Sequence, residues 1–135
     1  MAWFSLGSMA SATDAAYPSH PVRWIVPYAA GGATDALSRL ICQPLSERLG
    51  QPFIVENKPG AGSNIGTLAV INSPPDGYTL LLTSTANAIN ASFDPTLPYD
   101  FAKGIAPVAG LVWRFRSPHY LRRGFVMRTS EPKPR

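Results

Sequence analysis

The strongest constraint on the fold is a strand–loop–helix pattern that occurs three times along the chain. Apolar runs at 22–27, 52–57 and 78–83 have the length of buried strands and are bounded by proline or glycine. Helical spacing follows the first two runs, at 34–50 and 63–73, and a polar segment able to open a third helix follows the last. Repeated strand–helix units predict right-handed βαβ crossovers, and therefore an α/β protein with a parallel sheet and helices on its faces.

The first predicted helix is the clearest. Its leucines and isoleucine recur at helical spacing and predict one apolar face: Leu37, Leu40, Ile41, Leu45 and Leu49. Thr34 or Asp35 suits the N-cap, and Gly50 suits the left-handed residue after the last turn. Pro44 lies inside the predicted helix, where it would remove an internal hydrogen bond unless the helix kinks there. Cys42, the single cysteine, is expected to be a small buried apolar residue.

The basic character of the chain belongs to its last 23 residues. Residues 1–112 carry five Lys and Arg against seven Asp and Glu, whereas residues 113–135 carry seven against one. A nucleic-acid-binding function of the main body therefore has no support, and no nucleic acid is expected as a partner. Residues 113–135 show neither helical nor strand periodicity and are predicted to be a disordered tail, read out of frame. The alternative is a basic extension that contacts a membrane surface or nucleic acid.

The start of the chain has features of an export signal. A short apolar stretch precedes Ala10-Ser11-Ala12, the small-residue arrangement that signal peptidase favours, but no basic region precedes it. We interpret residues 1–16 as the remnant of a signal peptide, with a disordered leader as the alternative. The chain thus divides into the leader 1–16, a partial α/β lobe at 17–112 and the tail 113–135.

The residues do not point to an enzyme. The glycines of PGAGSNIG have the spacing G-x-G-x-x-x-G, one residue longer than the dinucleotide fingerprint, and no acidic residue ends the next strand. No Walker sequence and no G-x-S-x-G occur. The two histidines lie before the first predicted strand and in the tail. One cysteine cannot build a multi-cysteine metal site. We expect no catalytic residue, no metal and no cofactor.

Three segments after the predicted strands are rich in small and polar residues: the first loop segment (28–35), the second (59–66) and the third (83–90). In parallel sheets, such segments meet at the carboxyl ends of the strands and form the ligand crevice. Amides at helix N-termini favour an anion, and the lack of Arg or Lys beyond Lys58 favours a carboxylate over a polyphosphate. The alternative is that these are ordinary tight βα turns.

Taken together, these segments resemble the TctC/Bug family, the periplasmic solute receptors of tripartite tricarboxylate transporters. The resemblance rests on IVPYAAGGATD, LSERLGQP, VENKPGAGSNIG, PPDGYTLL and LPYDFAKGIAPVAGLV, and covers residues 17–112. It implies a two-lobed binding protein that closes on a small carboxylate in the periplasm and delivers it to membrane transporter subunits. Family members are considerably longer, so the resemblance implies a truncated receptor whose second lobe is missing and whose binding is impaired. The alternative is a nucleotide-binding Rossmann-like half-domain of an enzyme.

The resemblance also implies ligand-binding residues, through backbone amides, hydroxyls and bridging waters. In the first loop segment these are Tyr28, Ala29, Gly31, Gly32, Ala33, Thr34 and Asp35. In the second they are Gly62, Ser63 and Asn64, and in the third Ser84, Thr85 and Asn87. A purely structural role as a helix cap is an equally good reading of Asp35.

Overall fold

A computed structural model describes residues 16–115 and 121–129 of the chain. The predicted signal remnant at 1–16 lies outside the described residues except for Ala16. The chain forms a five-stranded sheet in the order β2-β1-β3-β5-β4. Its strands are β1 (Val22–Val26), β2 (Phe53–Asn57), β3 (Thr79–Leu82), β4 (Ile105–Phe115) and β5 (Leu121–Thr129). Its helices are α1 (Ala33–Leu49), the 3-10 turn η1 (Ala61–Ser63), α2 (Asn64–Ile71), α3 (Thr85–Phe93) and α4 (Phe101–Gly104).

The central strand β1 pairs in parallel with both β2 and β3, which confirms the predicted α/β fold with a parallel βαβαβ core. Trp24 lies opposite Val55 on one side and Leu80 on the other. Because side chains alternate along a strand, β1 contributes Trp24 to one face of the sheet and Ile25 to the other. Two separate apolar clusters result, one on each face.

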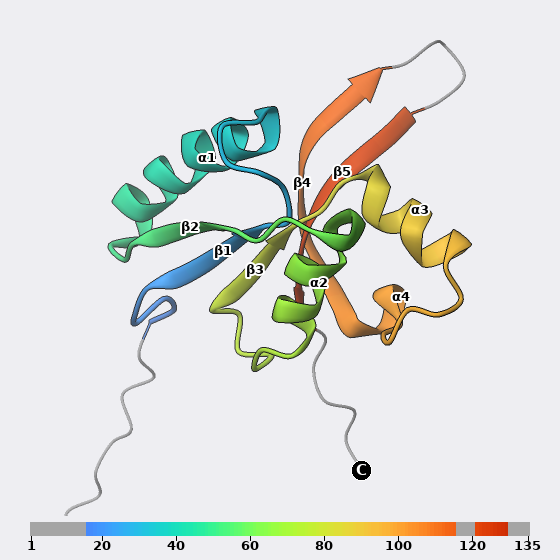
Figure 1. Ribbon diagram of the computed structural model, residues 1–135. Helices are drawn as coiled ribbons and strands as arrows, with labels where there is room; N and C mark the ends of the chain where they lie inside the picture. The colour runs from blue at the N-terminus through green and yellow to red at the C-terminus, as the bar shows by residue number, and fades with distance from the viewer. Residues whose placement is uncertain (1–15, 116–120, 130–135) are drawn as a thin grey trace, which may run out of the picture.

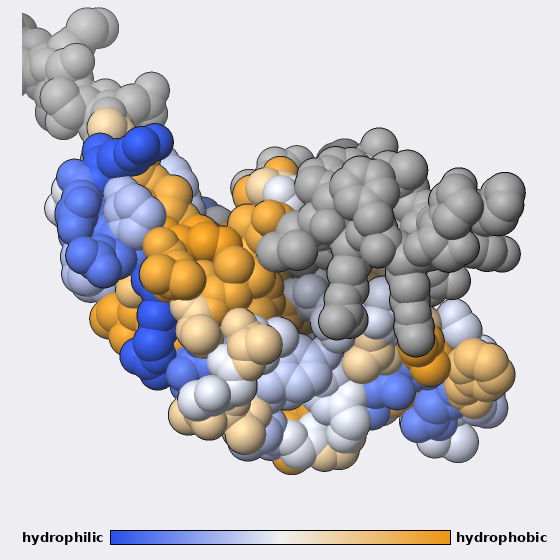
Figure 2. Space-filling view, turned by 90° about the horizontal axis from the view of Figure 1, so that it is seen from above, coloured by the Kyte–Doolittle hydropathy of each residue, from blue (hydrophilic) through white to orange (hydrophobic). Residues whose placement is uncertain are grey.

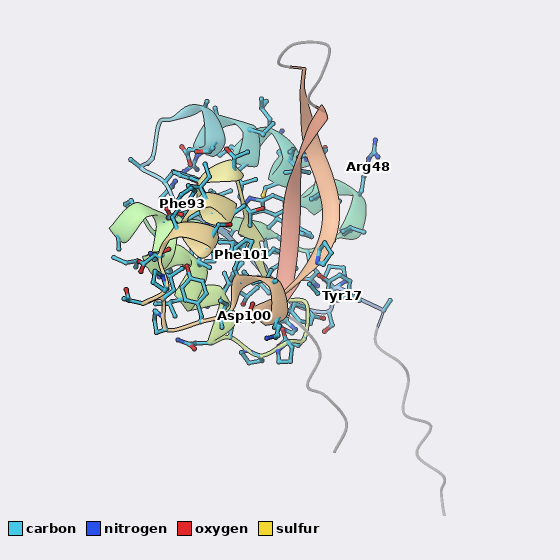
Figure 3. The ribbon with its side chains drawn as sticks, turned by 90° about the vertical axis from the view of Figure 1, so that its right-hand side faces the viewer. Tyr17, Arg48, Phe93, Asp100 and Phe101 are labelled. Atoms are coloured by element: carbon cyan, nitrogen blue, oxygen red, sulfur yellow. The ribbon has the colours of Figure 1, made fainter. Side chains whose placement is uncertain are left out.

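Helices cover both faces of the sheet. Cys42 of α1 joins the cluster around Trp24, whereas Val70 of α2 joins the cluster around Ile25. Phe101 of α4 packs against the second cluster. Figure 1 shows α1 on one side and α2, α3 and α4 gathered on the other. In Figure 3 the strands β4 and β5 separate Phe93 and Phe101 from Arg48 at the end of α1.

Helix α1 differs in detail from its prediction. Its N-cap is Gly32 rather than Thr34 or Asp35, while Gly50 has the left-handed conformation expected after the last turn. Cys42 is buried as predicted, but Leu40 is 72% exposed. Ser38 and Cys42 are buried against the sheet, and Ile41 and Leu45 of the predicted apolar face pack against the same cluster. Leu40 and Leu49 are exposed, so the predicted face meets the core only in part. The helix also runs through Pro44 without ending.

The hairpin of β4 and β5 corrects the prediction of a disordered tail. Part of residues 113–135 is regular strand: β4 continues to Phe115, and β5 lies antiparallel between β3 and β4. Sheet pairing uses backbone groups that every non-proline residue carries, so a run without clear periodicity can still join a sheet. The remaining tail residues, 116–120 and 130–135, lie outside the described part of the chain.

The exposed surface of the described residues includes apolar side chains. Figure 2 shows an apolar area, in orange, in a hollow of the face that faces the viewer. None of the helices among residues 16–115 and 121–129 has the length and apolar character needed to cross a bilayer.

Candidate functional site

The three loop segments lie at the carboxyl ends of the parallel strands β1, β2 and β3, as predicted. The first connects β1 to α1, the second connects β2 to α2, and the third connects β3 to α3. Each therefore ends at a helix N-terminus, where free backbone N–H groups and the helix dipole favour an anion.

The second loop segment has an unusual backbone. Four consecutive residues have positive φ: Gly60 at 124°, Ala61 at 46°, Gly62 at 61° and Ser63 at 81°. Left-handed backbone is uncommon for residues with a Cβ, and two such residues in one turn store strain. The segment persists in this shape only because its neighbours hold it.

Asn87 of α3 is one of the neighbours that bond to it. The Asn87 Nδ2 donates to Ser63 Oγ and to Thr67 Oγ1, each over 3.0 Å. Its Oδ1 accepts from the Ser84 backbone N–H over 3.0 Å and from the Tyr28 hydroxyl over 3.2 Å. Asn87 thereby joins all three loop segments, and it is only 3% exposed.

Ser84 completes this network. It is the N-cap of α3, and its Oγ accepts from the Ala86 backbone N–H over 3.1 Å. With Asn87 it forms a capping box, in which the side chain of each residue accepts a hydrogen bond from the backbone N–H of the other. The Ser84 and Tyr28 hydroxyls lie 2.5 Å apart, which ties α3 directly to the end of β1.

Asp35 has its own set of partners. Its Oδ2 accepts from the Gly31 backbone N–H over 2.9 Å and from Arg39 Nε over 3.1 Å. Arg39 also lies 3.5 Å from the Asn57 amide oxygen at the end of β2. The hydrogen bond from Arg39, followed by that from Gly31, lowers the pKa of Asp35 to about 2. Asp35 is thus an ionised, buried carboxylate that shapes the first loop segment.

The nominated residues differ in their access to solvent. The exposed ones are Ala29, Gly31, Gly32, Ala33, Gly62 and Thr85. The half-buried ones are Tyr28, Thr34, Asn64 and Ser84, and the buried ones are Asp35, Ser63 and Asn87. The exposed set consists mostly of backbone and of one hydroxyl, a surface suited to donating amide hydrogen bonds to an anion.

Comparison with known proteins places this arrangement in a family. The model of the tripartite tricarboxylate transporter family receptor, TctC, matches residues 37–121. The chain belongs to this receptor family. It is 43% identical over 95 residues to protein BugT of Bordetella pertussis. The aligned region covers 69% of this chain and 29% of BugT.

Solved structures of periplasmic binding proteins also match this chain. The periplasmic binding protein BugD is 39% identical, with a TM-score of 0.66 over 72% of this chain and 32% of BugD. MatC from Rhodopseudomonas palustris, solved with bound malate, is 36% identical with a TM-score of 0.66, covering 70% of this chain and 33% of MatC. The chain thus spans about a third of the length of the TctC receptors that it matches.

Several residues that hold the loop segments in place were absent from the sequence-based set. Thr67 and Asn90 bind the second loop segment: Thr67 Oγ1 accepts from Asn87, and Asn90 donates to the Gly62 carbonyl. Tyr99 donates to Asn64 Oδ1 over 2.7 Å. Asn90 follows Asn87 by three residues and therefore lies on the same face of α3. This spacing was the signal in the sequence that could have added Asn90 to the predicted site residues.

A hollow of about 540 Å³ lies between α3 and α4. It is lined by Ala88, Ala91, Ser92, Asp94, Pro95, Leu97, Tyr99, Asp100, Phe101 and Ala102. None of the nominated ligand residues lines it, so it is separate from the site at the strand ends. Within residues 16–115 and 121–129, no three His, Cys, Asp or Glu residues gather as metal ligands would.

Proposed function

We propose that the chain is an extracytoplasmic solute-binding receptor for a small carboxylate, acting in the periplasm with the membrane subunits of a tripartite transporter. Membership of the TctC family carries this proposal, since that family consists of periplasmic solute receptors. The exposed residues of the three loop segments are the proposed contact surface, on one wall of the binding cleft.

The charge of the site supports a carboxylate. Lys58, the cation at the edge of the second loop segment, lies 3.8 Å from Glu56, and Arg39 is paired with Asp35. The surface therefore offers amide donors without a free cluster of cations, which suits a singly charged carboxylate group better than a polyphosphate. The bound malate of MatC is a ligand of this chemical class.

The nucleotide-binding alternative has less support. A dinucleotide site uses an acidic residue at the end of the strand that follows the glycine turn, which is β3 in this chain, to hold a ribose. Strand β3 ends in Leu82 and is followed by Thr83 and Ser84. Asp76 lies before β3, where its carboxylate accepts from the Tyr78 backbone N–H over 2.9 Å. The acidic residue is thus engaged in a turn at the opposite end of the strand.

We expect weak binding by this chain alone. A receptor that closes around its ligand uses both walls of the cleft, and the chain spans about a third of its relatives. A calorimetric titration with malate or succinate should show no submicromolar affinity. A submicromolar Kd would show that one wall is enough.

The proposal is tested by NMR, in which the isotope-labelled chain is titrated with malate or succinate at millimolar concentration. We expect the backbone amide resonances of Gly32, Gly62 and Thr85 to shift with a carboxylate and to stay in place with NAD or ATP. A response to the nucleotides alone would refute the receptor function and favour the Rossmann-like alternative.

A further inference from the structure

We propose that Asn87 is a positioning residue of the candidate site, which holds the three loop segments together and makes no contact with the ligand. The inference rests on the proposed receptor function and changes the role given to one nominated residue. Asn87 reaches Tyr28, Ser63 and Ser84, one residue from each loop segment, while almost none of its own surface is exposed.

The orientation of the Asn87 amide follows from its partners. The Ser84 backbone N–H can only donate, so the Asn87 atom that faces it at 3.0 Å is the carbonyl oxygen Oδ1. The NH₂ group therefore faces the Ser63 and Thr67 hydroxyl oxygens. With two bonds accepted and two donated, the amide has no hydrogen-bonding capacity left for a ligand.

The same count applies to the two hydroxyls beside it. Tyr28 donates its single proton to Asn87 Oδ1, so in its 2.5 Å contact with Ser84 it accepts, and Ser84 donates. Both protons are used within the network. The donors left on the exposed residues are their backbone amides, except that of Gly31, which donates to Asp35, and the hydroxyl of Thr85. The nominated residues thus divide into a buried or half-buried framework around Asn87 and an exposed contact surface.

Helix α3 also offsets the strain of the second loop segment. Asn90 donates to the Gly62 carbonyl and Asn87 donates to Ser63 Oγ, and both recipients have positive φ. Without these bonds the segment has less reason to stay in its left-handed shape, because such backbone costs free energy for residues with a Cβ. Loss of the Asn87 side chain should therefore change the geometry of the contact surface.

The test compares isotope-labelled native chain with Asn87→Ala and the isosteric Asn87→Asp, which replaces the NH₂ donors with an oxygen. Without ligand, we expect the Gly60 and Gly62 amide resonances to shift in both variants. Hydrogen exchange of the Ser63 amide, which is buried and donates to the Gly60 carbonyl over 3.0 Å, should accelerate at least tenfold. Malate should then no longer shift the Gly60 and Gly62 resonances. Val70→Ala is the matched control, since it removes buried core atoms of α2 without touching the network. It should leave the loop resonances in place.

A second comparison separates positioning from contact. Thr85→Ala should weaken the response to malate while the Gly60 and Gly62 resonances of the free chain stay unchanged. The proposal is overturned if the Asn87 variants leave these resonances unchanged, or if Val70→Ala moves them equally. The proposal is also overturned if Asn87→Ala loses the malate response while the Gly60 and Gly62 resonances of the free chain stay unchanged. That result would make Asn87 a residue that contacts the ligand. A native chain that ignores malate refutes the receptor function, and the ligand-free spectra still decide the role of Asn87.

Discussion

The indole Nε1 of Trp24 donates a hydrogen bond to Ser38 Oγ over 3.1 Å inside the core between β1 and α1. Ser38 passes the connection on by donating to the Thr34 carbonyl over 2.7 Å. Both residues are buried, so this pair fixes how α1 lies on the sheet and where the first loop segment enters the helix. A buried polar pair of this kind costs more to break than it contributes when intact.

Ser38→Ala should therefore destabilise the chain by about 1–3 kcal/mol, because the buried Trp24 N–H loses its acceptor. Ser92→Ala is the matched control: Ser92 donates to the Ala88 carbonyl in the same way, but on an exposed helix surface. Its effect should stay within about 0.5 kcal/mol. Urea denaturation followed by circular dichroism measures both variants, and equal losses would contradict the special role of the indole contact.

Gly66→Ala should be strongly destabilising because the first turn of α2 lies directly against the end of β1. An added Cβ at Gly66 would lie 2.7 Å from Pro27 Cβ and 2.9 Å from the Lys58 carbonyl oxygen. Overpacking of this kind costs about 1–3 kcal/mol. At Gly32 the nearest atom to a new Cβ lies 3.5 Å away, so Gly32→Ala should lose less stability. Thermal unfolding of the two variants tests the difference, and a larger loss at Gly32 would contradict it.

Cys42 should be unreactive in the folded chain. Burial raises the pKa of its thiol to about 12, and a protonated, inaccessible thiol is a poor nucleophile. We expect a disulfide reagent at pH 8 to label Cys42 only as fast as the chain unfolds, and rapidly in urea. Labelling of the folded chain at the rate of a free thiol peptide would show that α1 does not cover this position.

Asp35 should make stability depend on pH in the acid range. Its partners lower its pKa from 3.8 to about 2, so the folded state gains stability from its ionised form above pH 4. That gain is lost as the pH falls from about 4 towards 2. The Asp35→Asn variant cannot titrate, so its stability deficit relative to the native chain should shrink over this window. Urea denaturation at a series of pH values measures the deficit, and a constant deficit would contradict the ion pair with Arg39.

The parallel core and the positions of the loop segments could be predicted from the sequence because strand length and helical spacing are local signals. The exact burial pattern of α1 could not be predicted, because it depends on which residues of the helix pack against Trp24 of the sheet. The partners of Asn87 were also out of reach: the residue contacts Ser63 over 24 positions and Tyr28 over 59, and single side-chain bonds leave no periodicity. Strand β5 was missed for a related reason, because backbone pairing carries little sequence signature.

The positive φ values of Ala61 and Ser63 have a stereochemical consequence. Backbone of this kind is the mirror image of what L-residues prefer, and it is the relaxed state of a D-amino acid. If the chain were assembled by chemical synthesis with D-alanine at position 61, the turn would keep its shape while the local handedness penalty disappeared. The second loop segment of the proposed site thus has, at these two positions, the backbone conformation that D-residues prefer.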